Sequence, residues 1–384
     1  MFIKKLSNTG LKILQGNEAC SEGAIAAGCQ FFAGYPITPA SEIAECMATR
    51  IPQSGGTFLQ MEDEIGSINA IIGARWGGRK AMTATSGPGF SLMQEGLGYG
   101  IITETPIVII NVQRGGPSTG QPTSSSQQDI YQAKYGSHGD YELIAYAPSS
   151  VQEMFDFTVK AFNQAEKYRV PVIILADEII GHMRERILIP EEVKIEVKKS
   201  PPAPQAPYQT DEYMIPPAVE FFQGHNLIID GQLHDERGLR AAHLIDVSEK
   251  LVKRLSNKLL NNIEEITDLE NYQTQDASLV VISYGSVART SLEAVKKARS
   301  SGLAVGFIKV NTVWPFPEKR LQLLTKKATS IIVPEMNMGK YYREIRGALR
   351  DKNVVSMPLV GGNIHKPIEI YNKMREVLEN ARVS

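Results

Sequence analysis

The sequence contains few cysteines, and their spacing does not suit a metal site. Cys20, Cys29 and Cys46 are the only three in 384 residues, and no two of them form a CxxC motif. This excludes a disulfide-rich scaffold and argues against an iron–sulfur cluster or structural zinc held by this chain. The six histidines also lack metal-ligand spacing, so we expect no metal site. Reduced, partly buried thiols in a cytoplasmic protein are the expected state.

Long apolar runs and a strong net charge are also missing. The longest strongly apolar run is about the length of PIVIINV, which is too short to cross a bilayer. The first residues, MFIKKLSNTGLKIL, show neither an apolar signal core nor a small-residue cleavage site, so secretion is not expected. The formal net charge of -1 favours neither nucleic acid nor an anionic membrane as a partner.

The first half of the chain alternates strand-like and helix-like segments. The runs FFAG, TFLQM and AMTATS are each followed by a helical pattern. PIVIINV is apolar without alternation, which is typical of a strand whose two faces are both covered. These patterns predict an α/β fold with a doubly wound parallel sheet over residues 1–197.

A change in composition marks the end of this first domain. The stretch KKSPPAPQAPY predicts an extended, proline-rich linker that opens a connecting region over residues 198–275. Within that region we expect a long polar helix ending near Asn261. Strand-like and helix-like segments then alternate again over residues 276–384, which predicts a second α/β domain.

The first candidate site is the motif YPITPASEIAE at residues 35–45. Its two prolines make a rigid loop after a strand and hold the Thr38 hydroxyl at the strand's carboxyl end, where open α/β sheets bind ligands. Ser41 is the expected N-cap of the next helix. The alternative is a turn followed by a capped helix, with no further role.

The second candidate is Glu64, the last of three acids in MEDE. It precedes the run IGSINAIIGA, which we expect to form a helix buried nearly all round. Burial would raise the pKa of Glu64 and the helix N-terminus would lower it, so the carboxyl group could share a proton with a ligand nitrogen. The alternative is a solvated acid in the first turn. We interpret Glu62 and Asp63 as ordinary first-turn or capping acids.

The third candidate is Arg114 in NVQRGGPSTGQPTSSSQQD, at residues 111–129. Its guanidinium could clasp a carboxylate through two hydrogen bonds, or it could be structural. The glycine and hydroxyl residues that follow predict a mobile loop over a site. SGPGF is not a phosphate-binding loop, because no Gly-Lys-Ser/Thr follows it. HGD and HDERG are interpreted as polar anchors of loops.

Taken in order, YPITPASEIAE, MEDEIGSINAIIGA and NVQRGGPSTGQPT strongly resemble the alpha subunit of 2-oxoacid:ferredoxin oxidoreductases. HDERG and ISYGSV…PFP…VPEMNMGK are similar to the same family, so the resemblance covers nearly the whole chain. The loop and HGDY…APSSVQE look most like the 2-oxoglutarate members. The resemblance implies a domain of the thiamine pyrimidine-binding type followed by a domain like the transketolase C-terminal domain.

The resemblance also implies an activity and a set of site residues. The family oxidatively decarboxylates a 2-oxoacid to an acyl-CoA with thiamine diphosphate (ThDP), coenzyme A and iron–sulfur clusters, and passes the electrons to ferredoxin. Glu64 would be catalytic, with its carboxyl group on N1′ of the ThDP aminopyrimidine, where it promotes loss of the C2 proton. Thr38 and Arg114 match positions that bind the substrate carboxylate. Pro36 and Ser86 would contact the cofactor.

The same resemblance implies partners. The Gly-Asp-Gly motif that holds Mg²⁺ and the diphosphate in thiamine enzymes is missing from this sequence. A beta subunit should therefore carry the diphosphate, the Mg²⁺ and a [4Fe-4S] cluster, and gamma or delta subunits would be separate chains where the complex has them. Pyruvate or a branched-chain oxoacid remains an alternative substrate. A non-catalytic binding subunit is the alternative from another class.

Overall fold

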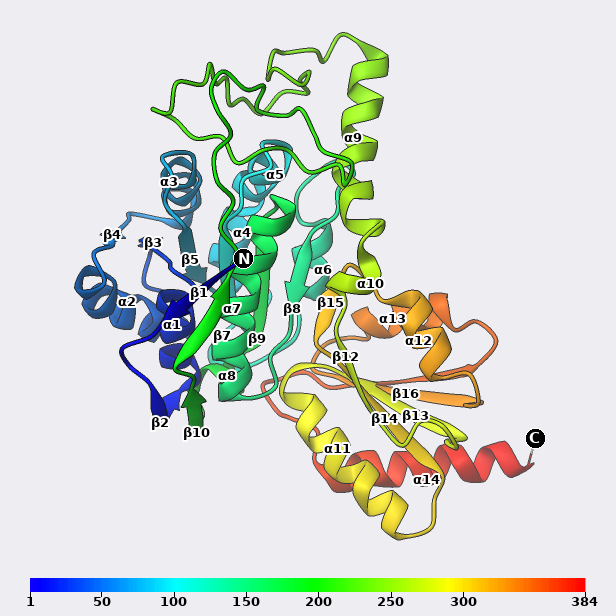
Figure 1. Ribbon diagram of the computed structural model, residues 1–384. Helices are drawn as coiled ribbons and strands as arrows, with labels where there is room; N and C mark the ends of the chain where they lie inside the picture. Colours follow the sequence, from blue (N-terminus) through cyan, green and yellow to red (C-terminus); the bar gives the residue numbers. More distant parts are fainter. Residues whose placement is uncertain (384) are drawn as a thin grey trace.

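The computed structural model describes residues 1–383. Its strands form an eight-stranded sheet, a five-stranded sheet and two small ribbons. Figure 1 shows the larger sheet with the blue-to-green helices of the first half of the chain, and the smaller sheet with the yellow-to-red helices. Long loops and helix α9 (Ile245–Leu260) stand above the larger sheet in this view.

The larger sheet is built from parallel strands. All neighbours from β8 to β4 run parallel, whereas β15 is antiparallel to β8 and β7 is antiparallel to β6. The spatial order is β15 (Thr312–Trp314), β8 (Ile144–Tyr146), β9 (Val172–Asp177), β6 (Val108–Gly115), β5 (Ala81–Thr85), β3 (Phe31–Gly34) and β4 (Thr57–Gln60), with β7 (Gln121–Ser125) beside β6.

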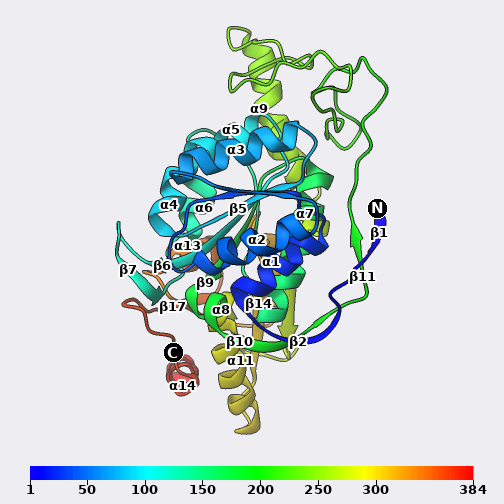
Figure 2. The ribbon, with the colours of Figure 1, turned by 90° about the vertical axis from the view of Figure 1, so that its left-hand side faces the viewer.

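Helices cover both faces of this sheet, as the apolar run of its central strand predicted. Along β6, Val108, Ile110 and Val112 point into one apolar core, while Ile109 points into the other. In Figure 2, α3 and α5 lie on one side of β5, and α1 and α2 lie on the other. The doubly wound α/β prediction is confirmed. The covering helices are α1 (Gly16–Ala26), α2 (Ser41–Gln53) and α7 (Val151–Tyr168) on one face, and α3 (Glu64–Trp76) and α5 (Gln94–Ile102) on the other.

Two antiparallel ribbons flank the first core and were missing from the sequence interpretation. Each pairs a strand from the first 15 residues with a strand that follows β9 in the sequence. Strand β1 (Phe2–Lys5) pairs with β11 (Glu192–Ile195), and β2 (Gly10–Gln15) pairs with β10 (Arg184–Ile189). Because the paired strands are far apart in the sequence, no local pattern predicts these ribbons. Short helices complete this part: α4 (Gly87–Leu92), α6 (Ile130–Tyr135) and α8 (Glu178–His182).

The smaller sheet is mainly parallel, and helices again cover both of its faces. Helices α11 (Gly285–Ser300) and α14 (Pro367–Val383) pack on one face, and α12 (Glu318–Leu324) and α13 (Lys340–Ala348) on the other. Its strand order is β12 (Leu269–Tyr272), β14 (Val305–Val310), β13 (Leu279–Ser283), β16 (Ser330–Glu335) and β17 (Asn353–Pro358), with only β12 antiparallel.

Residues 196–244 contain no regular helix or strand, but they are packed against the first domain. The backbone N–H of Phe221 donates to the carbonyl of Trp76 at 2.9 Å, and the Tyr99 hydroxyl donates to the carbonyl of Ile229 at 3.1 Å. The part of the connecting region that follows the proline-rich stretch is therefore docked on the first domain. Helix α9 then ends one residue before Asn261, as predicted, and the short helix α10 (Ile263–Ile266) follows. The domain boundaries at 197 and 275 stay a prediction.

Two local predictions are wrong. Ser41 is the first residue of α2 rather than its cap, because Ala40 already occupies the N-cap position. Helix α3 is not buried all round: Ile65 is 49% exposed, and Asn69 and Gly73 continue the same exposed stripe. Four-residue spacing puts these positions on one helix face, and the apolar composition of the run hid that face.

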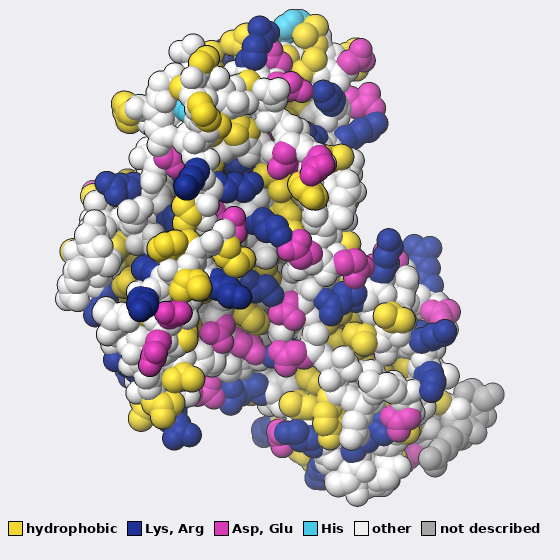
Figure 3. All heavy atoms as spheres, viewed as in Figure 1, with side chains coloured by type: hydrophobic (Ala, Val, Ile, Leu, Met, Phe, Trp, Pro, Cys, Tyr) yellow, Lys and Arg dark blue, Asp and Glu magenta, His cyan; other side chains and the backbone are white. Residues whose placement is uncertain are grey.

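The surface carries both signs of charge. Figure 3 shows Lys and Arg side chains interspersed with Asp and Glu on the face it presents. No helix within residues 1–383 is long and apolar enough to span a membrane.

Candidate active site

Three segments of the candidate site lie at the ends of three neighbouring parallel strands. Strands β3, β5 and β6 lie side by side and run in the same direction, so their carboxyl ends share one edge of the sheet. The YPITP loop leaves β3, the SGPGF turn leaves β5, and Arg114 lies near the end of β6. Open α/β sheets bind ligands at this edge.

Glu64 begins helix α3 and is buried. Asp63 is the N-cap, and its side chain accepts a 2.7 Å hydrogen bond from the backbone N–H of Gly66. This capping leaves Glu64 in the first helical turn, where it is only 4% exposed. No Lys, Arg or His among the described residues forms an ion pair with it. The interpretation of Asp63 as a capping acid is thus confirmed. Glu64 differs from it, because Glu64 is buried and does not cap the helix.

The surroundings of Glu64 raise its pKa. Burial is the largest cause, and the negative charge of Asp63 adds to it. The backbone N–H at the helix N-terminus, the positive charge of Arg114 and the hydroxyl of Thr85 work in the opposite direction. Because burial prevails, the carboxyl group holds a proton more readily than an ordinary glutamate does.

The Gly87–Pro88–Gly89 turn lies between Glu64 and Arg114. A Cβ added to Gly89 would lie 2.1 Å from Oε1 of Glu64, and one added to Gly87 would lie 3.6 Å from Cγ of Arg114. Gly87 also adopts a φ of +29°, which side-chain-bearing residues rarely do. Glycine at position 89 is therefore what allows the carboxyl group of Glu64 to occupy its place.

Arg114 and Thr38 are brought together, though not through the Thr38 hydroxyl. Nη1 of Arg114 donates a 2.7 Å hydrogen bond to the backbone carbonyl of Thr38. Arg114 is 6% exposed, and its buried Nε has no hydrogen-bond partner within the described structure. Part of the guanidinium fork is therefore available to a ligand.

The segment after Arg114, where a mobile loop was predicted, folds back as a hairpin; its mobility stays a prediction. Strand β7 turns back onto β6, pairing Ser125 with Arg114 and Gln121 with Gly115. Gly120 makes the turn with a φ of +55°, and a Cβ there would lie 1.8 Å from the carbonyl oxygen of Gly115. Glycine at position 120 thus permits a tight turn.

The remaining predicted cofactor residues lie near the same edge. Ser86 is fully buried at the N-cap of α4, and its hydroxyl has no partner within the described structure. Pro36 is exposed in the loop two residues before Thr38. An unpartnered buried hydroxyl and a buried carboxyl group with a raised pKa suit a polar ring with nitrogen acceptors and donors. This donor set fits the aminopyrimidine of ThDP.

A cavity of about 670 Å³ opens beside Arg114. Sequence reasoning missed several of its polar residues. Asp129 accepts a 3.0 Å hydrogen bond from Nδ2 of Asn111, and burial raises the pKa of Asp129. Lys340 reaches the cavity from the second domain. The VPEMNMGK motif quoted for the family resemblance was the only signal for Lys340.

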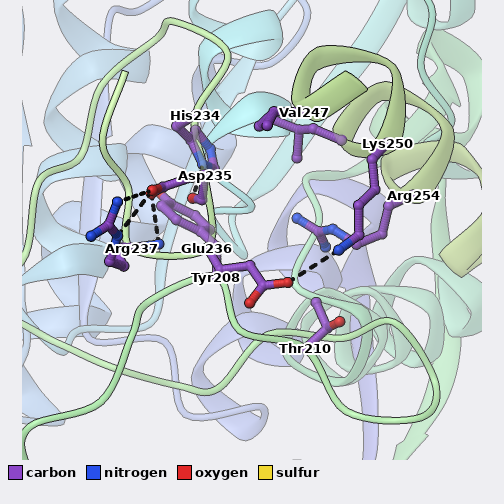
Figure 4. Close-up of a pocket in the computed structure, with 10 residues that line it drawn as sticks. Tyr208, Thr210, His234, Asp235, Glu236, Arg237, Val247, Lys250 and Arg254 are labelled. Atoms are coloured by element: carbon purple, nitrogen blue, oxygen red, sulfur yellow. Dashed lines mark hydrogen bonds and ion pairs between the residues drawn. The ribbon is translucent and has the colours of Figure 1, made fainter. Parts of the chain in front are cut away.

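A second cavity, of about 350 Å³, lies between α9 and the HDERG turn and shares no residue with the first. Figure 4 shows Lys250 and Arg254 of α9 facing Tyr208 and the turn. His234 stacks on Tyr208 with ring centroids 3.9 Å apart, and its ring nitrogens lie 3.2 Å and 3.0 Å from the carbonyl oxygens of Ile102 and Asp235. HDERG is a loop anchor, as predicted.

Two family models match this chain. Residues 22–254 match the model for the thiamine diphosphate-binding domain of pyruvate flavodoxin/ferredoxin oxidoreductases. Residues 277–370 match core domain II of pyruvate:ferredoxin oxidoreductase. The chain belongs to the pyruvate flavodoxin/ferredoxin oxidoreductase family. Within this oxidoreductase family, the candidate site lies in the matched thiamine diphosphate-binding segment.

Similar proteins carry 2-oxoglutarate names. The chain is 54% identical to the 2-oxoglutarate synthase subunit KorA of Methanothermobacter marburgensis over 94% of this chain and 97% of that protein. A solved structure of 2-oxoglutarate:ferredoxin oxidoreductase from Magnetococcus marinus, with 2-oxoglutarate, coenzyme A and succinyl-CoA bound, matches with a TM-score of 0.91 and 33% identity. That match covers 96% of this chain and 65% of the Magnetococcus chain.

The fold is also similar to a split-gene transketolase. The TM-score is 0.55 at 10% identity, over 95% of this chain and 98% of the transketolase chain. At this identity the likeness concerns the fold alone. It confirms the expected transketolase-like architecture of this oxidoreductase family member. No cluster of three or more His, Cys, Asp or Glu side chains suited to a metal ion occurs within the described residues.

Proposed function

We propose that this chain is the alpha subunit of a 2-oxoglutarate:ferredoxin oxidoreductase. The reaction converts 2-oxoglutarate and coenzyme A into succinyl-CoA and CO₂ and passes the electrons to ferredoxin, and it is reversible. The observation that carries the proposal is the buried carboxyl group of Glu64 beside the Arg114 guanidinium, in a chain 54% identical to a 2-oxoglutarate synthase subunit.

Glu64 is the residue that moves a proton. Its raised pKa lets it share a proton with the ring nitrogen N1′ of the pyrimidine, and the helix N-terminus keeps the carboxylate form accessible. ThDP, when bound, supplies the carbon nucleophile that adds to the keto group and accepts the charge left by departing CO₂. Gly89 keeps space for the Glu64 carboxyl group, and Ser86 and Pro36 are the proposed neighbours of the cofactor.

Arg114 and Thr38 orient the substrate. The free part of the Arg114 fork binds the carboxylate next to the keto carbon through charge-assisted hydrogen bonds. Its bond to the Thr38 carbonyl fixes the YPITP loop, so that the Thr38 hydroxyl can take part at the same end of the substrate. Holding the oxoacid in one orientation removes much of the entropic barrier to reaction.

The partners belong to the proposal as well. The subunit names of the relatives indicate a multi-subunit complex. We propose a beta subunit that supplies the diphosphate site, Mg²⁺ and a [4Fe-4S] cluster, with ferredoxin as the electron acceptor and, where present, gamma and delta subunits. A cytoplasmic location is supported by Cys20, Cys29 and Cys46, which are free thiols.

Pyruvate is the second candidate substrate, because the matching family model is described by it. The deciding experiment is a panel of 2-oxoglutarate, pyruvate and 2-oxoisovalerate, assayed with coenzyme A and a viologen dye on the complex of this chain with its partner subunits. We expect kcat/KM for 2-oxoglutarate to exceed the others by at least about tenfold, as polar recognition typically allows. Preferred turnover of pyruvate would overturn the proposed substrate. A fully assembled complex that turns over no oxoacid would favour a non-catalytic subunit.

A further inference from the structure

The cavity beside Arg114 has walls from both domains. The β6–β7 hairpin and the start of α4 form one wall. Met338 and Lys340, at the start of α13 in the second domain, form another. A branched aliphatic substrate would leave polar groups here without hydrogen bonds, whereas a second carboxylate could use them. The uncharged polar side chains of the cavity are Ser91, Ser118, Gln128 and Gln132.

Lys340 is held in place by the elements around it. Its Nζ donates a 2.6 Å hydrogen bond to the carbonyl of Gln128, and its backbone N–H donates to Oδ1 of Asn337 at 2.8 Å. Asn337 is in turn tied to the first domain, because its Nδ2 donates to the carbonyl of Gln127 at 2.9 Å. An ammonium group has three N–H donors, so Lys340 retains donors for a ligand.

The charges of the cavity favour an additional anion. Arg114 and Lys340 are its two cationic side chains, and Asp129 is its one carboxyl group. Burial raises the pKa of Asp129, against the hydrogen bond from Asn111 and the positive charges of Lys340 and Arg114. With Arg114 assigned to the carboxylate beside the keto group, Lys340 remains as a cation with no assigned anionic partner on the substrate.

We propose that Lys340 binds the distal carboxylate of a dicarboxylic 2-oxoacid while Arg114 holds the carboxylate beside the keto carbon. The inference rests on the proposed function, since it assigns the second anchor of the same substrate. It gives the second domain a direct role in substrate selection. A monocarboxylic oxoacid presents no group to Lys340, so its turnover should not depend on this lysine.

The test compares two substrates on the assembled complex. Lys340→Met removes the charge at similar length, Lys340→Arg keeps a charge, and Lys326→Met is the control, an exposed lysine of the second domain outside the cavity. Kinetics are measured with 2-oxoglutarate and with 2-oxobutyrate. We expect Lys340→Met to lower kcat/KM for 2-oxoglutarate by about 10- to 100-fold, mainly through KM, and to leave 2-oxobutyrate within about twofold.

The arginine variant should recover most of the lost kcat/KM, and the control should match the wild-type complex. Equal losses on both oxoacids, no recovery with arginine, or an effect confined to KM for coenzyme A would overturn the role of Lys340 alone. A wild-type complex that does not oxidise 2-oxoglutarate would overturn the proposed function, and the inference with it. The wild-type measurement thus separates the two failures.

Discussion

The guanidinium of Arg114 is hydrogen-bonded to the backbone carbonyl of Thr38 at 2.7 Å. Arg114 lies near the end of β6 and Thr38 follows β3. These strands are separated by β5 in the sheet, so the bond crosses the whole carboxyl edge of the candidate site. It joins the two residues proposed to bind the substrate carboxylate. We therefore propose two functions for Arg114: it fixes a loop, and it offers its remaining N–H groups to the substrate.

Replacement of Arg114 by lysine should separate these two functions. An ammonium group can keep a bond to the Thr38 carbonyl, but it lacks the planar fork that binds a carboxylate through two hydrogen bonds. We expect KM for the oxoacid to rise by about 10- to 100-fold, since a charge-assisted hydrogen bond is lost. Steady-state kinetics with varied oxoacid and varied ferredoxin measure this. A change seen only in the ferredoxin kinetics would contradict the assignment.

Glu64→Gln should abolish proton transfer without disturbing assembly. Glutamine has the same shape, but it cannot exchange a proton with the pyrimidine nitrogen. We expect turnover to fall by about 10²- to 10⁴-fold, the usual contribution of general acid–base catalysis. NMR of hydrogen–deuterium exchange at C2 of bound ThDP is the direct readout. Glu62→Gln, two residues earlier and exposed, is the control. Exchange at the wild-type rate in Glu64→Gln would show that Glu64 has another role.

Part of the site could be predicted because Thr38 and Arg114 lie at strand ends. The apolar run of β6 and the short runs of β3 and β5 show where strands stop, and parallel strands bring their carboxyl ends to one edge. Thr38 and Arg114 were found in this way, whereas Glu64 was found because it is the last of three acids before the apolar run of α3. The roles given to them came from the family resemblance rather than from the strand pattern.

The parts that could not be predicted depend on contacts between distant segments. Lys340 bonds to Gln128 across 212 residues of sequence, and nothing near either residue marks the other. The close approach of Gly89 to Glu64 is a similar case. The need for glycine in SGPGF is evident only when α3 is packed against the turn. The exposed stripe of α3 escaped notice because small and apolar residues occur on both of its faces.

Gly89→Ala tests the close approach directly. The added Cβ would lie 2.1 Å from Oε1 of Glu64, so the carboxyl group must move. We expect turnover to fall, together with a destabilisation of about 1–3 kcal/mol, the usual cost of overpacking. Gly347→Ala in α13 is a matched control, because its Cβ would meet nothing within 4 Å. Thermal unfolding and dye-reduction assays measure the two effects. Normal turnover in Gly89→Ala would mean that the carboxyl position is not critical.

The last prediction concerns Asp177, which joins the two domains. It ends β9, is 1% exposed, and accepts a 2.8 Å hydrogen bond from the backbone N–H of Ser286 in α11. Burial raises the pKa of Asp177 from 3.8 to about 6, against the hydrogen bonds that it accepts. Between these two values the folded chain holds a proton that the unfolded chain has released, so the unfolding free energy falls as pH rises from about 4 to about 6.

Asp177→Asn removes this titration while keeping an oxygen that can accept the bond from Ser286. The wild-type melting temperature should therefore decrease relative to that of the variant as pH rises through this window, and the difference should be constant at higher pH. Asp140→Asn, at an exposed loop position, is the control for the substitution itself. Melting temperatures recorded by circular dichroism at closely spaced pH values measure both differences. If the difference between wild type and Asp177→Asn does not change with pH, Asp177 does not hold its proton in the folded chain, and its contact with α11 is made by the carboxylate.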